Sequence, residues 1–82
     1  MSGVDKLLEA MRANPRDWRI EDVTRVCARF GVDCSMPRKG SHCKVKHSAV
    51  PEILTIPAAR PIKPVYIRAL VRFIDAVRGA EQ

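Results

Sequence analysis

The chain has 82 residues, of which 46% are hydrophobic and 29% charged. This composition suits one small globular domain, because a chain of this length buries only about 60% of the surface that its unfolded form exposes. Its apolar runs are far shorter than the roughly 20 residues of a membrane-spanning helix, and its first residues lack a basic-then-apolar leader. We therefore expect a cytoplasmic protein with no membrane partner. Three cysteines are an odd and sparse set, so we expect reduced thiols.

The whole chain has a formal net charge of +6, and the positive charge is concentrated in one segment. Residues 1–37 carry six basic and six acidic side chains, whereas residues 38–72 carry eight basic side chains and a single acid, Glu52. A concentrated basic segment is typical of proteins that bind a polyanion, either nucleic acid or an acidic partner protein. The alternative is an ordinary solvated surface that happens to be basic.

Two N-terminal segments have apolar residues at the spacing of an amphipathic helix. These residues are Val4, Leu7, Leu8 and Met11 in the first segment, and Val23, Val26, Cys27 and Phe30 in the second. The pattern predicts one helix over residues 3–13, capped by Ser2, and another over residues 21–30. Gly31 stands where a left-handed residue ends a helix.

After Gly31 the hydrophobic period changes to two, which predicts strands. The first covers residues 32–36, the second residues 41–47, and the third residues 52–56 between two prolines. Lys39-Gly40 predicts a tight hairpin turn between the first two strands.

A last helix is predicted from Pro64 to Gly79, with one apolar stripe along it. The order is thus two helices, three strands and a helix. Three antiparallel strands need a helical cover on one face, so the sequence predicts a two-layer α+β domain whose other sheet face is open to solvent or ligand.

The second strand carries the candidate chemistry. If Cys43 and Val45 face the core, then His42, Lys44 and Lys46 emerge together on the opposite face. Cleavage of RNA without a metal needs a group that moves a proton near neutral pH and cations that stabilise the phosphate. His42 is the candidate catalytic residue, with phosphate contacts from Lys39, Lys44 and Lys46. The alternative is that His42 is an ordinary surface residue on a strand that binds RNA without cutting it.

Other side chains give weaker signals. Arg68 and Arg72 either form a solvated helix face or extend the phosphate-binding surface. Trp18 and Tyr66 could stack on bases, but neither lies on the basic strand. His47 is at a position of the strand that should face the core, but it lies at the strand end, which favours a structural role or a contact in the turn. The spacing of cysteines and histidines does not suit a metal site, and no phosphate-binding glycine loop is present, so we expect no metal and no small-molecule cofactor.

The residues around the second strand resemble the HicA toxin family. The resemblance rests on the step Gly40-Ser41-His42 with basic residues before it, and on Phe30-Gly31, Ile56-Pro57 and Lys63-Pro64 at the ends of the predicted elements. It implies a double-stranded-RNA-binding-domain-like fold, a helix, three strands and a helix. It also implies a ribosome-independent mRNA ribonuclease that a HicB antitoxin neutralises, with His42 at the position of the family's catalytic histidine.

The resemblance covers residues 20–78, which form a HicA-like core within a single domain, and residues 1–19 add a helix and a linker. Many members have a second histidine directly after the first, where this chain has Cys43. Many also have a histidine just after the proline of the third strand, where this chain has Ala58-Ala59. The extra helix either covers a surface or extends the core. The expected RNA contacts are Lys39, Gly40, Ser41, Lys44, Lys46, Arg68 and Arg72.

Overall fold

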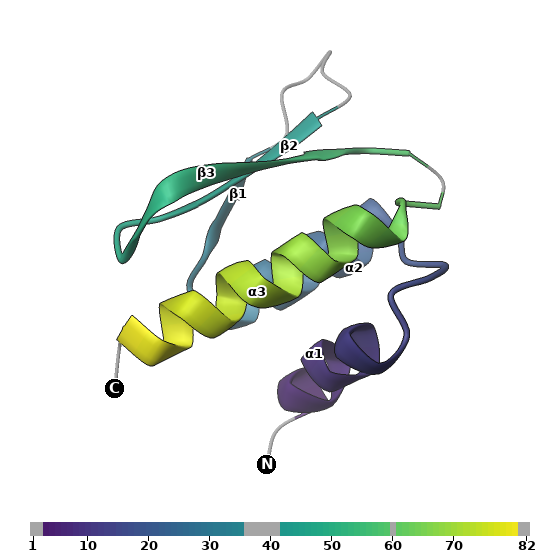
Figure 1. The fold of residues 1–82 in the computed structure, drawn as a ribbon, viewed down its shortest axis with the longest axis horizontal. Coiled ribbons are helices and arrows are strands. Elements are labelled where there is room, and N and C mark those ends of the chain that lie inside the picture. The colour runs from purple at the N-terminus through teal and green to yellow at the C-terminus, as the bar shows by residue number, and fades with distance from the viewer. Residues whose placement is uncertain (1–2, 36–41, 60, 81–82) are drawn as a thin grey trace.

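Strands and helices follow one another in the predicted order in a computed structural model that describes residues 3–35, 42–59 and 61–80 (Figure 1). The elements are α1 (Gly3–Ala13), α2 (Ile20–Arg29), β1 (Asp33–Ser35), β2 (His42–His47), β3 (Val50–Pro57) and α3 (Pro64–Ala80). The predicted cap at Ser2 and the predicted turn at Lys39-Gly40 lie outside the described residues. The α+β class and the helix, three-strand, helix order of the core are confirmed.

The three strands form one antiparallel sheet with β2 in the centre. Cys34 of β1 lies opposite Val45, and Cys43 of β2 lies opposite Ile56 of β3. The pairing of β2 with β3 shifts between Val45 and His47. This register decides which side chains become neighbours on each face of the sheet.

All three described helices lie on one side of the sheet (Figure 1). Helix α3 packs on β3 and α2 packs on β1, while α1 packs on α2 and α3, further from the strands. Leu8 and Met11 of α1 are buried in the same core as Ile67 of α3. The N-terminal helix therefore extends the core and adds a third layer to the two layers predicted, without covering the open face of the sheet.

An ion pair fixes α1 to α3. The Arg12 guanidinium donates two hydrogen bonds to Asp75, from Nη1 to Oδ2 over 2.7 Å and from Nη2 to Oδ1 over 2.8 Å. Its Nε also bonds Glu9 Oε1 of α1 at 3.1 Å. The Arg12 hydrogen bonds lower the pKa of Asp75.

Local signals explain where the helices start and stop. The Asp22 side chain accepts a hydrogen bond from the backbone N–H of Arg19 at 3.0 Å, which satisfies a donor at the start of α2. Gly31 follows the helix with a φ of +67°, as predicted for a left-handed terminating residue. Gly79 does not end α3, which continues to Ala80; that expectation was wrong, because Gly79 does not adopt the positive φ that Gly31 has after α2.

Strand lengths differ slightly from the predictions. Strand β1 begins at Asp33 rather than at Val32, and the predicted end at Met36 lies outside the described residues. Strand β3 extends beyond 52–56 to include Pro51 and Pro57. Proline is accommodated because β3 is at the edge of the sheet, where one side of the strand has no partner. No described helix is long and apolar enough to cross a membrane.

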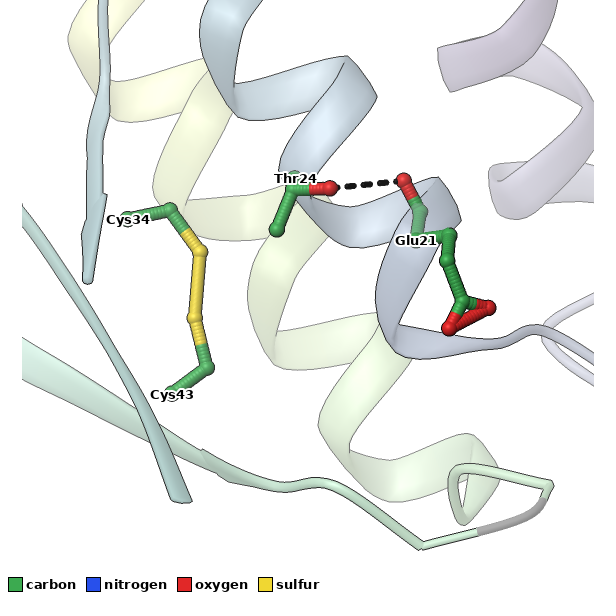
Figure 2. The surroundings of a disulfide bond; sticks show 4 residues. All are labelled: Glu21, Thr24, Cys34 and Cys43. Carbon is green, nitrogen blue, oxygen red and sulfur yellow. Dashed lines mark hydrogen bonds between the residues drawn. A yellow bond between two sulfur atoms is a disulfide. The ribbon is translucent and has the colours of Figure 1, made fainter. Parts of the chain in front are cut away.

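The expectation of reduced cysteines also needs correction. Cys34 and Cys43 form a disulfide, with their Cα atoms 6.3 Å apart, so the prediction of three reduced thiols is wrong for this pair. Figure 2 shows both side chains pointing from the strands toward the helix layer. Antiparallel pairing places them diagonally on the covered face of the sheet, an adjacency that cysteine counting cannot detect. A crosslink over this short separation of 9 residues stabilises by about 2–3 kcal/mol in the chain-entropy account.

Candidate nucleic-acid interface

Strand β2 separates its side chains between the two faces of the sheet. Cys43 and Val45 are completely buried, while His42, Lys44 and Lys46 are exposed. The predicted parity is confirmed, and its cause is the alternation of successive side chains along a strand. The helices cover one side of the sheet (Figure 1). The exposed His42, Lys44 and Lys46 side chains therefore belong to the opposite, open face.

The neighbouring strands give the two lysines different surroundings. Lys44 lies opposite Ser35 on one side and Thr55 on the other, and both of these hydroxyl side chains are exposed. Lys46 lies opposite Asp33, an exposed acid. Because opposite charges on facing residues offset each other, we expect a greater positive potential near Lys44 than near Lys46. Sequence reasoning did not assign Ser35, Thr55 or Asp33 to the site, since only the sheet register reveals them.

His42 has a different kind of neighbour. Its partner in the register is Pro57, the last residue of β3. Directly opposed residues of an antiparallel pair project from the same face, with Cβ atoms about 4.5–5.5 Å apart. The imidazole thus lies at the end of the sheet where the chain leaves β3 and approaches α3.

The other predicted contacts are distributed differently. Lys39, Gly40 and Ser41 precede His42 in the chain and lie outside the described residues. Arg68 and Arg72 are exposed, but they belong to α3, on the other side of the sheet from the β2 lysines. The fold therefore does not bring these two arginines into one row with Lys44 and Lys46.

Arg72 instead lines a groove along the outer edge of the sheet. The groove has a volume of about 300 Å³ and runs between β3 and α3, where Arg72 is accompanied by Glu52 and by the apolar side chains of Ile53 and Phe73. The one acid of the basic segment is therefore in the same groove as this arginine. RNA on the open face could reach Arg72 only around the β3 edge.

His47 has the structural role that its position predicted. It is half-buried at the end of β2, and its Nδ1 accepts a hydrogen bond from the backbone N–H of Ala49 at 2.9 Å. This contact belongs to the short turn between β2 and β3. The two histidines of the strand are thus placed differently, one on the open face and one in a turn.

The two candidate stacking residues also differ. Trp18 packs against the core, and its indole Nε1 donates to the Asn14 carbonyl at 2.6 Å, so it is a packing anchor. Tyr66 is half-buried near the start of α3 and lines a pocket of about 150 Å³ with Pro57, Ala59 and Lys63. The sequence placed Tyr66 away from the basic strand, but the fold brings it close to the cross-strand neighbour of His42.

The remaining cysteine and the acidic residues offer no separate chemistry. Cys27 is a free, buried thiol, and burial raises its pKa to about 12, so it is an unreactive core residue. Among the described residues, no group of three or more His, Cys, Asp or Glu side chains could hold a metal ion.

Comparison of the chain with protein-family models, with curated proteins and with solved structures found no match. The resemblance to HicA toxins therefore remains a prediction from the residues quoted above.

Proposed function

We propose that this protein is a metal-independent endoribonuclease that cleaves mRNA, the toxin component of a type II toxin–antitoxin system. The observation that carries the proposal is the open face of β2, where His42 stands in line with Lys44 and Lys46. The Gly40-Ser41-His42 step and the α2-β1-β2-β3-α3 order are what the resemblance to HicA toxins leads one to expect. His42 is the proposed general acid or base.

The proposed reaction uses the 2′-hydroxyl of RNA as the nucleophile. The 2′-oxygen bonds to the adjacent phosphorus while the bond from phosphorus to the 5′-oxygen breaks. An imidazole on the open face can accept the 2′-hydroxyl proton or donate a proton to the leaving oxygen. Lysine ammonium groups, first of all Lys44, stabilise the charge that develops on the phosphate oxygens. A proton-transfer group of this kind contributes about 10²–10⁴-fold to a rate.

The partner and the compartment follow from the same proposal. mRNA cleavage places the protein in the cytoplasm, and a HicB-like antitoxin would neutralise it by covering the basic face. The Cys34–Cys43 disulfide departs from the usual state of cytoplasmic thiols, which glutathione and thioredoxin keep reduced. Both cysteines lie on the side of the sheet away from His42, so the proposed chemistry does not involve them.

The proposal is tested by replacing each histidine of β2. We expect His42→Ala to abolish the growth inhibition that expression of the wild type causes, and to slow RNA cleavage at least about 100-fold. RNA affinity should stay within a few-fold, because one neutral side chain adds little to a charge-driven interface. His47→Ala is the matched control, since this histidine contacts the β2–β3 turn.

Each outcome separates two functions. If His42→Ala and His47→Ala cleave RNA equally well, His42 is not the catalytic residue. If the wild type binds RNA but neither cleaves it nor inhibits growth, the protein is an RNA-binding module of the same fold. If it does not bind RNA, the basic face serves an acidic protein partner instead.

A further inference from the structure

A pocket lies where β3 leaves the sheet and α3 begins. Pro57, Ala59, Lys63 and Tyr66 form its walls around a volume of about 150 Å³. Pockets for drug-sized ligands have about 300–1,000 Å³, so this one has room for a single small ring system. Its walls offer a proline ring, a methyl group and an aromatic ring, with one cationic side chain.

The pocket is next to the proposed catalytic residue, because Pro57 both lines the pocket and pairs with His42. The register places Pro57 opposite His42 on β2, and Ile56, one residue earlier, is completely buried on the covered face. Pro57 therefore projects toward the open face beside the imidazole. A ligand group in the pocket would therefore contact the residue that pairs with His42 across the strands.

Polar side chains surround His42 and Lys44 elsewhere on the open face, including Ser35 and Thr55. Such a surface suits the phosphates and riboses of an RNA strand, but these polar side chains offer no flat apolar partner to an unstacked base. Single-stranded RNA is recognised by bases that leave the stack and lie on aromatic rings. Tyr66 is the half-buried aromatic ring that lines the pocket beside His42.

We propose that this pocket binds a nucleobase of the RNA, from a nucleotide that flanks the phosphate at His42. The Tyr66 ring stacks on the base, Pro57 bounds it on the side of the sheet, and Lys63 contacts the phosphate of the same nucleotide. This inference rests on the proposed function, because it takes the substrate to be single-stranded RNA with its scissile phosphate at His42.

The test measures RNA affinity in a His42→Ala background, so that cleavage does not consume the ligand. Tyr66→Leu removes the aromatic face but keeps an apolar side chain against the core, and Tyr66→Phe keeps the ring. Val65→Ala is the matched control, because Val65 is 56% exposed on the same turn of α3 and does not line the pocket. The probes are a short single-stranded RNA and the same RNA with one abasic ribose placed in turn at each position.

We expect Tyr66→Leu to weaken binding of the intact RNA about 5-fold or more, the lower end for loss of one stacked base. Tyr66→Phe and Val65→Ala should bind within about two-fold of the parent. With the abasic ribose at one position, the difference between Tyr66→Leu and the parent should disappear, because both then lack the stack. Thermal unfolding of each variant checks that the fold is retained.

A second measurement keeps the pocket unchanged. Addition of adenosine or uridine monophosphate to the protein should shift the NMR signals of the Tyr66 ring protons, whereas ribose 5-phosphate should not. Equal affinity of Tyr66→Leu and the parent for intact RNA, or equal loss with intact and abasic RNA, would overturn the pocket assignment and leave the proposed function standing. Failure of the protein to bind any RNA would overturn both.

Discussion

The two faces of the sheet contrast sharply, although the same three strands form both. On the covered face, Cys43, Val45 and Ile56 have no exposed area. On the open face, Lys44 and Thr55, which are next to Cys43 and Ile56 in the sequence, are exposed and polar. The alternation of side chains thus assigns stability to one set of residues and the candidate chemistry to the other. Substitutions at neighbouring positions of one strand should therefore affect different properties.

The pocket at Tyr66 lies where this separation ends. Pro57 projects from the open face beside His42, while Tyr66 comes from the helix layer that covers the other face. The end of the sheet is where a helix residue can reach a ligand bound on the open face. If the pocket binds a base as proposed, specificity for that base comes from this end of the sheet rather than from the central lysines.

The largest effect that tests the contrast is expected at Ile56. Ile56→Ala should lower the free energy of unfolding by about 2–5 kcal/mol, because it leaves a cavity in the core. Thr55→Ala, at the next position but on the open face, should lower it by less than about 1 kcal/mol. Urea unfolding followed by circular dichroism measures both. Similar losses for the two variants would contradict the division of the strand between the faces.

An intermediate effect is expected from the lysines of the open face. With four to six phosphate contacts from the whole basic segment of residues 38–72, log affinity for single-stranded RNA should fall with log salt at a slope of about −3 to −4, about −0.7 for each contact. Lys44→Ala should reduce this slope more than Lys46→Ala, because Asp33 opposite Lys46 already offsets its charge. Lys6→Ala, on helix α1, is the control and should leave the slope unchanged. A wild-type slope near zero would exclude RNA as the ligand.

The smallest effect concerns the ion pair that joins α1 to α3. Arg12 and Asp75 are 42% and 41% exposed, so solvent screening limits their contribution to about 0.2–1 kcal/mol. The lowered pKa of Asp75 means that this contribution is fully present above the unfolded carboxyl pKa of about 3.9 and disappears as the pH falls through the folded value. Urea unfolding of the wild type and Asp75→Asn should therefore differ at pH 7 and converge in strong acid.

Glu9→Gln provides the control for this pair. Glu9 also bonds Arg12, but it lies on the same helix, so its loss leaves the contact with α3 intact. The stability difference between wild type and Asp75→Asn should shrink in high salt. A difference that grows as the pH falls would contradict the assigned direction of the Asp75 pKa shift.

Sequence by itself determined the elements and the faces of β2. The spacing of apolar residues predicts both the helix of residues 3–13 and the exposure of His42 and Lys44. Each prediction depends only on the hydrophobic period within one segment of the sequence. A glycine that must adopt a positive φ, Gly31, marked the end of α2 in the same way. These signals depend only on neighbouring residues, and they were sufficient for the fold class.

Only the tertiary structure decided which distant residues meet. The register placed Asp33 opposite Lys46 and brought Cys34 and Cys43 into one disulfide, and the path of the chain after Pro57 brought Tyr66 beside the His42 end of the sheet. Such contacts join residues that no local period relates, because packing of the helices on the sheet and pairing of the strands fix them together. For the same reason the sequence grouped Arg72 with the lysines, whereas the fold places it in the groove on the other side of β3.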